Sequence, residues 1–171
     1  MTLRKSFDYS ARADAQVLIL GSMPGEESLR RQQYYAHPRN CFWDIMSALF
    51  GINRELPYPQ RLAKLQQQRI ALWDVARSCR RRGSLDASIA MPSVQANDFA
   101  ALFKHCPGIT HVFFNGRKAA ELFNKLVKHS VADLAHAVVF TALPSTSPAN
   151  ASISNAEKLA QWRAVKKALI R

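Results

Sequence analysis

The sequence has few cysteines and no metal-binding spacing among its histidines. Cys41, Cys79 and Cys106 are far apart and odd in number, and no CxxC pair occurs. This argues against a disulfide framework and against a zinc or iron–sulfur site. The five histidines show neither HxxxH nor HxH spacing. We therefore expect no metal, no cofactor, and three reduced thiols in or near the core.

The sequence also lacks a long apolar run. No stretch approaches the length that spans a membrane. The first residues become acidic at Asp8, where a signal peptide would need an apolar segment. We therefore expect a cytoplasmic protein without a membrane anchor.

Acidic residues are scarce relative to basic ones. Asp and Glu number 12 against 24 Lys and Arg, which gives a formal net charge of +12. Such an excess favours a polyanionic partner, most commonly nucleic acid, over a basic surface that only aids solubility. The chain of 171 residues is 48% hydrophobic, typical of one folded domain, and we predict a single domain over residues 1–171.

Four short apolar runs indicate strands buried on both faces. Their ranges are 17–20, 70–73, 111–114 and 137–142. Helical spacing of apolar residues occurs between the runs and after the last one, over 42–49, 99–103, 119–126 and 154–169. This alternation predicts a three-layer α/β/α sandwich around a central, mainly parallel sheet of four strands. Residues 56–59 and 91–96 are expected to be loops.

The last helix has its own sequence signals. Ser154 followed by Glu157 is the pattern of a capping box. The residues expected on its solvent face are basic, namely Lys158, Arg163, Lys166, Lys167 and Arg171.

The residues after each predicted strand are rich in turn-forming, hydroxyl and basic types. The four loops are 21–25, 74–83, 115–118 and 143–150, and they hold four of the six glycines. Ligands of open α/β sheets bind beyond the carboxyl ends of the strands. We therefore expect a phosphate-binding site there, although turn residues are common at this edge of any α/β protein.

The segment 34–43, YYAHPRNCFW, precedes the first predicted helix. Asn40 could cap that helix, and Phe42 and Trp43 could simply be core. Together with GSMPG, LWDVARSC, GSLD, FFNG and LPSTSPAN, however, this segment resembles the uracil-DNA glycosylase superfamily. The pattern is most similar to its hypoxanthine-DNA (deoxyinosine) glycosylase branch, and the resemblance covers residues 17–150.

The resemblance implies a pocket for a base flipped out of the duplex. Asn40 would be the principal catalytic residue and Asn115 would assist, while Phe42 would stack on the base. The other implied pocket residues are Gly21, Ser22, Met23, Pro24 and Asp74. The loop 143–150 would press on the DNA, and the expected DNA contacts are Arg39, Arg80, Arg81, Ser145, Thr146, Ser147 and Asn150.

Two departures from the uracil enzymes bear on the substrate. The loop after the first strand offers Ser22 and Met23 where the uracil and mismatch branches carry an acid or amide. Leu143 stands where the uracil enzymes have a histidine. Both departures fit the hypoxanthine branch, and the cysteine count excludes the iron–sulfur branches.

The residues themselves leave some alternatives open. An amide such as Asn40 has no useful pKa and can position water only. Asp74 or Asp86 could instead be a general base; otherwise Asp74 would bond loop amides or recognise the base, and Asp86 would cap a short helix. The residue that wedges into the duplex could be Thr146, Pro148 or Asn150.

We therefore expect a monomeric, monofunctional DNA glycosylase that hydrolyses the N-glycosidic bond of deoxyinosine in DNA containing deaminated bases, as a base excision repair enzyme. The alternatives are a uracil or G:T/G:U mismatch glycosylase of the same superfamily, and a non-catalytic nucleic-acid-binding module.

Overall fold

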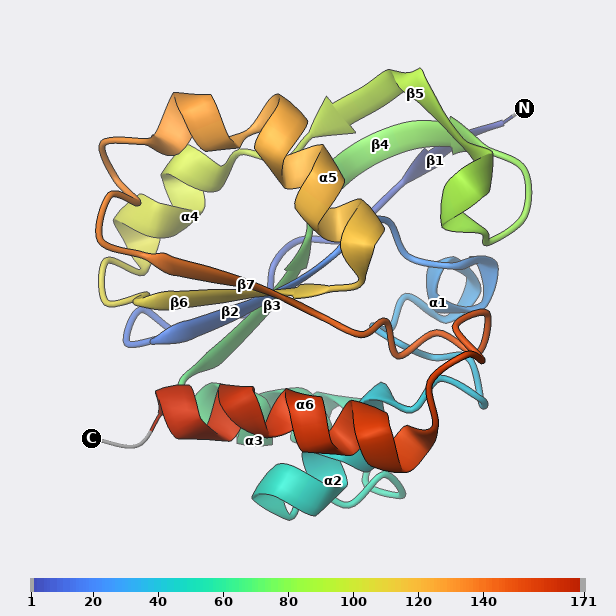
Figure 1. The fold of residues 1–171 in the computed structure, drawn as a ribbon, viewed down its shortest axis with the longest axis vertical. Coiled ribbons are helices and arrows are strands. Elements are labelled where there is room, and N and C mark those ends of the chain that lie inside the picture. Colours follow the sequence, from blue (N-terminus) through green and yellow to red (C-terminus); the bar gives the residue numbers. More distant parts are fainter. Residues whose placement is uncertain (1, 170–171) are drawn as a thin grey trace.

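A computed structural model describes residues 2–169. Its centre is a four-stranded sheet in the order β3-β2-β6-β7, and every neighbouring pair is parallel (Figure 1). The strands are β2 (Val17–Gly21), β3 (Ile70–Asp74), β6 (His111–Asn115) and β7 (Val139–Leu143). All residues of β2 and β3 are buried, as expected of continuous apolar strands covered on both sides.

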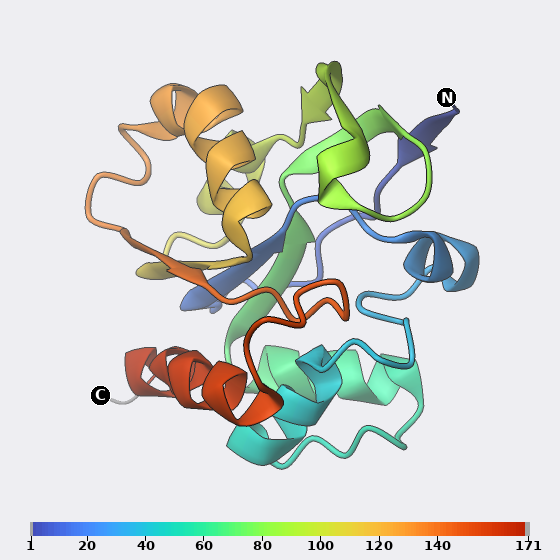
Figure 2. The same ribbon diagram turned by 45° about the vertical axis from the view of Figure 1, so that its right-hand side comes forward.

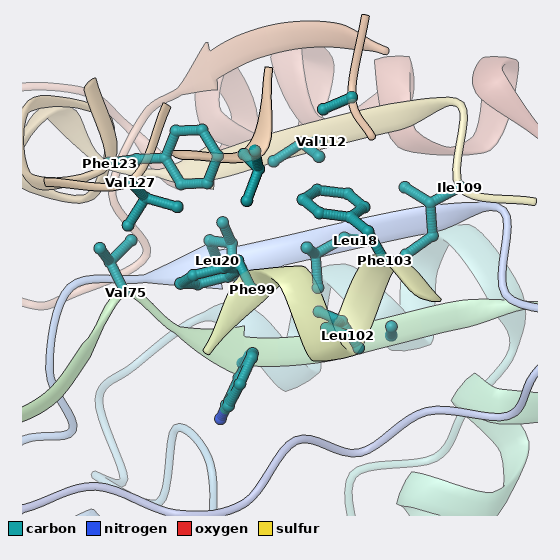
Figure 3. Close-up of a cluster of buried hydrophobic side chains, with 14 of the residues drawn as sticks. Leu18, Leu20, Val75, Phe99, Leu102, Phe103, Ile109, Val112, Phe123 and Val127 are labelled. Carbon is teal, nitrogen blue, oxygen red and sulfur yellow. The ribbon is translucent and has the colours of Figure 1, made fainter. Parts of the chain in front are cut away.

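Successive side chains of a strand point to opposite faces of the sheet. Leu18, Leu20 and Phe114 belong to one hydrophobic cluster, and Ile19 and Phe113 belong to the other. Figure 3 shows the first cluster, in which the leucines of β2 meet aromatic rings from the helices above. The sheet therefore separates two cores.

Helices cover both faces of the sheet (Figure 1). The first cluster lies under α4 (Phe99–His105) and α5 (Arg117–Leu126). The second lies against α2 (Phe42–Phe50), α3 (Tyr58–Gln67) and α6 (Asn155–Ala168). The predicted three-layer α/β/α architecture is confirmed. The remaining helical segments are α1 (Glu26–Arg31), η1 (Asp86–Ser88) and η2 (Lys128–Val131).

A second, antiparallel sheet was missed by the sequence analysis. It has the order β1-β4-β5, from β1 (Leu3–Lys5), β4 (Ala76–Arg81) and β5 (Ile89–Ala96). The predictions of loops over 74–83 and 91–96 are therefore wrong. These strands contain charged residues, Pro92 and shifts of register between Ala76 and Arg80, so neither an apolar run nor a regular alternation marks them.

The last helix begins as predicted, because Ser154 Oγ accepts a hydrogen bond from Glu157 N at 3.2 Å. Its basic face is not wholly exposed. Lys158 is only 3% exposed, since it faces the body of the protein; Arg171 lies outside the described residues.

The order of the strands places the site. The chain passes from β2 to β3 on one side and later to β6 on the other, so β2 and β6 flank the switch point of the sheet. In register, Gly21 lies beside Asp74, and Asn115 lies beside Leu143. The loops that follow these four residues gather at one edge, which is turned forward in Figure 2. Within residues 2–169 no helix is long and apolar enough to cross a membrane.

Candidate active site

The loop from Gly21 to Gly25 turns its carbonyl groups into the protein. Gly21 O accepts from Val75 N at 2.8 Å, and Ser22 O accepts from Ala76 N at 3.0 Å. The carbonyls of Met23 and Pro24 accept from a guanidinium. Because the C=O and the following N–H of a trans peptide point in opposite directions, the N–H groups of residues 22, 23 and 25 point the other way. Such an array is suited to a negatively charged group.

That guanidinium belongs to Arg81, which was predicted to contact DNA. Arg81 is only 1% exposed. Its Nη2 donates to Pro24 O at 2.5 Å and its Nε donates to Gly83 O at 2.8 Å. Arg81 ends β4, and the inward face of this strand carries it under the loop. In this position Arg81 holds the loop in place and does not reach a phosphate, so we remove it from the proposed DNA contacts.

Two buried polar atoms without a hydrogen-bond partner lie beside Gly21. They are Asp74 Oδ2 and Tyr35 Oη. A Cβ added to Gly21 would lie 2.3 Å from Asp74 Oδ1 and 3.4 Å from Tyr35 Oη. Glycine is thus required at position 21 because the two polar side chains approach its Cα closely. Buried polar atoms are nearly always bonded, so both atoms are available to a water molecule or to a polar group of a ligand.

Burial sets the protonation of both groups. Burial, and then the negative charge of Asp86, raise the pKa of Asp74 to about 7, while Arg81 opposes the shift. The pKa of the Tyr35 phenol is raised by burial and by the charge of Asp74. The side chain of Asn115 lies near the phenol and partly offsets the rise, but both of its polar atoms are bonded to Thr146 and it makes no hydrogen bond of good geometry to Tyr35 Oη. Tyr35 therefore stays protonated, and Asp74 changes charge near neutral pH.

Asp86 is tied to the same loop. Its Oδ1 accepts a hydrogen bond from Ser22 Oγ at 2.5 Å. The prediction that Asp86 caps a short helix is wrong. Helix η1 begins at Asp86 itself, and no side chain caps it. Ser22, a predicted pocket residue, is thereby linked to the β4–β5 connection, and Met23 packs against Cys79 and Ile89 beneath it.

Asn40 and Phe42 stand at the start of α2. Asn40 Oδ1 accepts from Phe42 N, the first N–H of the helix, at 2.9 Å. The N-cap residue of α2 is nevertheless Cys41, and no side chain caps the helix, so the interpretation of Asn40 as the cap is wrong. An amide oxygen has a second lone pair for another donor. Arg54 fixes the backbone here by donating to Asn40 O at 3.3 Å and to Pro38 O at 2.7 Å.

The ring of Phe42 is 0% exposed, and Tyr35 stacks on it with ring centroids 4.1 Å apart. A base could therefore not stack on Phe42 unless Tyr35 moved. Tyr35 has a φ of 56°, which is rare for an aromatic residue and marks strain. Tyr35 was not among the predicted site residues, although the pair of tyrosines before His37 is a visible signal in the sequence.

Asn115 joins β6 to the loop after β7. Its Oδ1 accepts from Thr146 N and its Nδ2 donates to Thr146 Oγ1, both at 2.9 Å. Thr146 is only 1% exposed, so this side chain lies inside the loop and not on the predicted DNA-contacting surface. Gly116 is needed beside it, because its φ is 97° and an added Cβ would lie 3.0 Å from Ser145 Cβ.

The other predicted DNA contacts are accessible. Arg39 and Arg80 are exposed, and Ser145, Ser147 and Asn150 are partly exposed. Ser145 Oγ and Ser147 Oγ accept from nearby backbone N–H groups, which leaves each hydroxyl hydrogen available to a partner. Two surface hollows are lined by other residues, among them Cys41 and Leu159 in one and Arg54 and Tyr35 in the other. Neither is lined by Gly21, Asp74 or Asn115, and Asp74 and Asn115 are only 3% and 8% exposed, so the side chains beside Gly21 are closed off from solvent in this structure.

No group of three His, Cys, Asp or Glu side chains within residues 2–169 is arranged to hold a metal ion.

Comparison with known proteins agrees with this arrangement. A Methanosarcina acetivorans protein named hypoxanthine DNA glycosylase is 35% identical over 164 residues, covering 95% of this chain and 98% of the relative. One of the same name from Methanosarcina barkeri is 38% identical over 109 residues, covering 63% of this chain and 68% of the relative.

A solution NMR structure of a Methanosarcina acetivorans protein, described as a candidate uracil DNA glycosylase, has a TM-score of 0.80 and 34% identity and covers 98% of this chain and 99% of that chain. The family model of the uracil DNA glycosylase superfamily matches residues 7–168. The chain therefore belongs to the uracil DNA glycosylase superfamily.

Proposed function

We propose that this protein removes hypoxanthine from DNA by hydrolysing the N-glycosidic bond of deoxyinosine. Two curated relatives carry the name hypoxanthine DNA glycosylase. The observation that carries the proposal is the pair of unpartnered buried atoms, Asp74 Oδ2 and Tyr35 Oη, beside Gly21. A flipped base would supply the partners that both atoms lack.

The edge of hypoxanthine matches this pair. Its N1–H donates and its O6 accepts, whereas the same edge of adenine has an accepting N1 and a donating amino group. An ionised Asp74 would accept from N1–H, and the protonated Tyr35 would donate to O6. Adenine would place the lone pair of N1 against the carboxylate, which is unfavourable. The pair therefore favours hypoxanthine over adenine, the base from which it forms by deamination.

The base leaves with the electron pair of the bond between N9 and the sugar. Negative charge develops on the base and positive charge on the sugar. The N–H groups of residues 22, 23 and 25 are preorganised donors for the negative charge, because the bonds to the loop carbonyls fix their direction. Water then adds to the anomeric carbon, and the proton it loses balances the proton gained by the base.

Asn40 is proposed to hold that water through the free lone pair of Oδ1. Both polar groups of Asn115 are bonded to Thr146, so we assign Asn115 a positioning role: it keeps the loop 143–150 against the site. Because Tyr35 covers Phe42, the base would meet the ring of Tyr35, and Phe42 would support that ring from behind. Entry of the base requires the closed space beside Gly21 to open.

Uracil is the second candidate substrate, because it presents the same donor and acceptor pair through N3–H and O4. A binding module without catalysis is the third. It is disfavoured because phosphate binding would need neither Asn40 nor a buried polar pair.

Single-turnover cleavage of oligonucleotides with one deoxyinosine or one deoxyuridine tests the proposal, with alkali to reveal abasic sites. We expect wild type to cleave at deoxyinosine, Asn40→Ala to lose this activity, and Asn124→Ala, which changes an exposed amide on α5, to retain it. Cleavage at deoxyuridine alone would establish the second candidate. DNA binding with no cleavage of either substrate would establish the third.

A further inference from the structure

The connection between β4 and β5 is fastened to the site at three points. Ser84 Oγ accepts from Glu26 N at 2.8 Å, and Asp86 Oδ1 accepts from Ser22 Oγ at 2.5 Å. Gly83 O accepts from Arg81 Nε at 2.8 Å. In both views this connection and α1 lie at the edge where the central strands end (Figures 1 and 2).

Leu85 stands between two of these fastened residues and is 56% exposed. It is the most exposed of the large hydrophobic side chains in residues 2–169. Leu126 ends α5 and Val139 begins β7, so both lie toward the opposite edge of the sheet. An exposed leucine held on a short, bonded connection beside a site costs hydration free energy unless a partner covers it.

The loop 143–150 offers no comparably exposed apolar side chain at the predicted wedge positions. Thr146, one of the predicted wedge residues, is buried and bonded to Asn115. Asn150 Nδ2 donates back to Ser145 O at 3.2 Å. Pro148 is the remaining predicted wedge residue, and it is only partly exposed.

Charge beside Leu85 favours DNA as the partner that covers it. Arg82 is exposed on the same connection and Arg80 is exposed near the end of β4, just before it, and the whole chain carries a formal charge of +12. Proteins that distort DNA insert apolar side chains, leucine among them, between base steps. Flipping a base leaves a gap in the stack of the duplex, and its unstacking costs a few kcal/mol.

We propose that Leu85 enters the duplex and fills the space that the flipped nucleotide leaves. This rests on the proposed function, because only a base-flipping enzyme creates that space. The bonds at residues 83, 84 and 86 hold the leucine in place before DNA binds, so little conformational entropy is lost on insertion.

The first test compares double-stranded with single-stranded deoxyinosine substrate under single-turnover conditions. A wedge is needed only where bases are stacked and paired. Leu85→Ala should slow cleavage in the duplex roughly 10- to 100-fold, as expected for losing the burial of one leucine side chain. It should leave cleavage of the single strand nearly unchanged. Leu85→Phe should restore much of the duplex rate, and Val139→Ala, which changes a similarly exposed apolar residue (53%), should match wild type.

The second test does not depend on catalysis. A duplex with a tetrahydrofuran abasic-site analogue and a neighbouring 2-aminopurine reports unstacking as a rise in fluorescence. Wild type and Val139→Ala should produce the rise, and Leu85→Ala should bind without it. If this pattern appears while no substrate is cleaved, the proposed function fails and the wedge stands. Three results would overturn the wedge. The first is a Leu85→Ala variant with unchanged duplex cleavage rate and unchanged fluorescence, and the second is an equal loss of its cleavage rate on single-stranded and double-stranded substrate. The third is a loss of cleavage rate in Pro148→Ala that is confined to the duplex.

Discussion

At the scale of single residues, the site depends on side chains whose burial changes their chemistry. Asp74 is 3% exposed and lies at the end of a wholly buried strand. A carboxyl group there loses hydration when ionised, and the nearby Asp86 adds repulsion. The same burial that makes Asp74 suitable for reading a base therefore destabilises its charged form.

Stability should consequently depend on pH through Asp74. The folded protein holds this proton up to a pKa of about 7, whereas the ordinary value is 3.8. The native state thus binds more protons than the unfolded chain between these values, so stability falls as pH rises through that window. At 1.36 kcal/mol for each pKa unit, the loss is on the order of 4 kcal/mol.

Asp74→Asn should remove this loss. Thermal unfolding should show the variant more stable than wild type at pH 8, and more stable by a much smaller margin at pH 5. The exposed Asp133→Asn is the control and should follow wild type at both. An equal difference between Asp74→Asn and wild type at the two pH values would mean that Asp74 does not titrate in this window.

At the scale of elements, the antiparallel sheet shapes the loop after β2. After Asp74 the chain bends and continues as β4, and the N–H groups of Val75 and Ala76 bind the loop carbonyls on the way. β4 then ends at Arg81, whose guanidinium binds the next two carbonyls. One continuous segment from β3 to β4 thus sets the direction of the loop N–H groups.

Arg81→Met should therefore destabilise the loop from Gly21 to Gly25, because it removes the bonds from the guanidinium to the loop carbonyls. Hydrogen bonds from a charged group contribute about 1.5–3 kcal/mol each, so we expect a loss of about 3 kcal/mol in the free energy of unfolding and a lower single-turnover rate. Arg77→Met, on the same strand and exposed, should change stability little. Chemical denaturation measures both variants, and equal stabilities would contradict the clamping role of Arg81.

At the scale of the whole molecule, the excess of positive charge and the edge at which the central strands end both favour DNA binding. Arg39 lies in the segment just before α2, and Arg80 lies on β4. Both segments reach this edge. A cation that contacts phosphate releases bound counterions from DNA, which makes affinity depend on salt. That the protein acts as a monomer in the cytoplasm, without metal or cofactor, stays a prediction.

The salt dependence of DNA binding should locate the contacts. Arg39→Ala and Arg80→Ala should each flatten the slope of log affinity against log salt by about 0.9. Arg12→Ala is the control, because Arg12 is paired with Asp14 at 2.6 Å just before β2 begins, on the far edge of the sheet. Fluorescence anisotropy over a range of salt concentrations measures the slopes, and an effect of Arg12→Ala as large as the others would place the DNA elsewhere.

The sequence by itself determined the central sheet, most of the helices on its faces and the family. Helix α3 was not predicted, and the expectation of a loop over 56–59 is wrong because α3 begins at Tyr58. Short apolar runs bounded by turn residues, such as 17–20, indicate strands covered on both sides, although β7 proved to be largely unburied. The loops that follow parallel strands meet at one edge. For the same reason Gly21, Asp74 and Asn115 could be placed together in advance. The order of motifs then indicated the superfamily.

Only the tertiary structure decided which side chains at that edge face inward. Arg80 and Arg81 are adjacent in sequence, but the alternation of β4 exposes one and buries the other. Tyr35 covers Phe42 because a residue with left-handed backbone turns its ring there. The pairing of β4 with β5 brings their connection, with Leu85 and Asp86, to the site. There Asp86 bonds Ser22, which lies 64 residues earlier in the sequence. Local patterns do not carry such information, because direction and pairing depend on what the rest of the chain packs against.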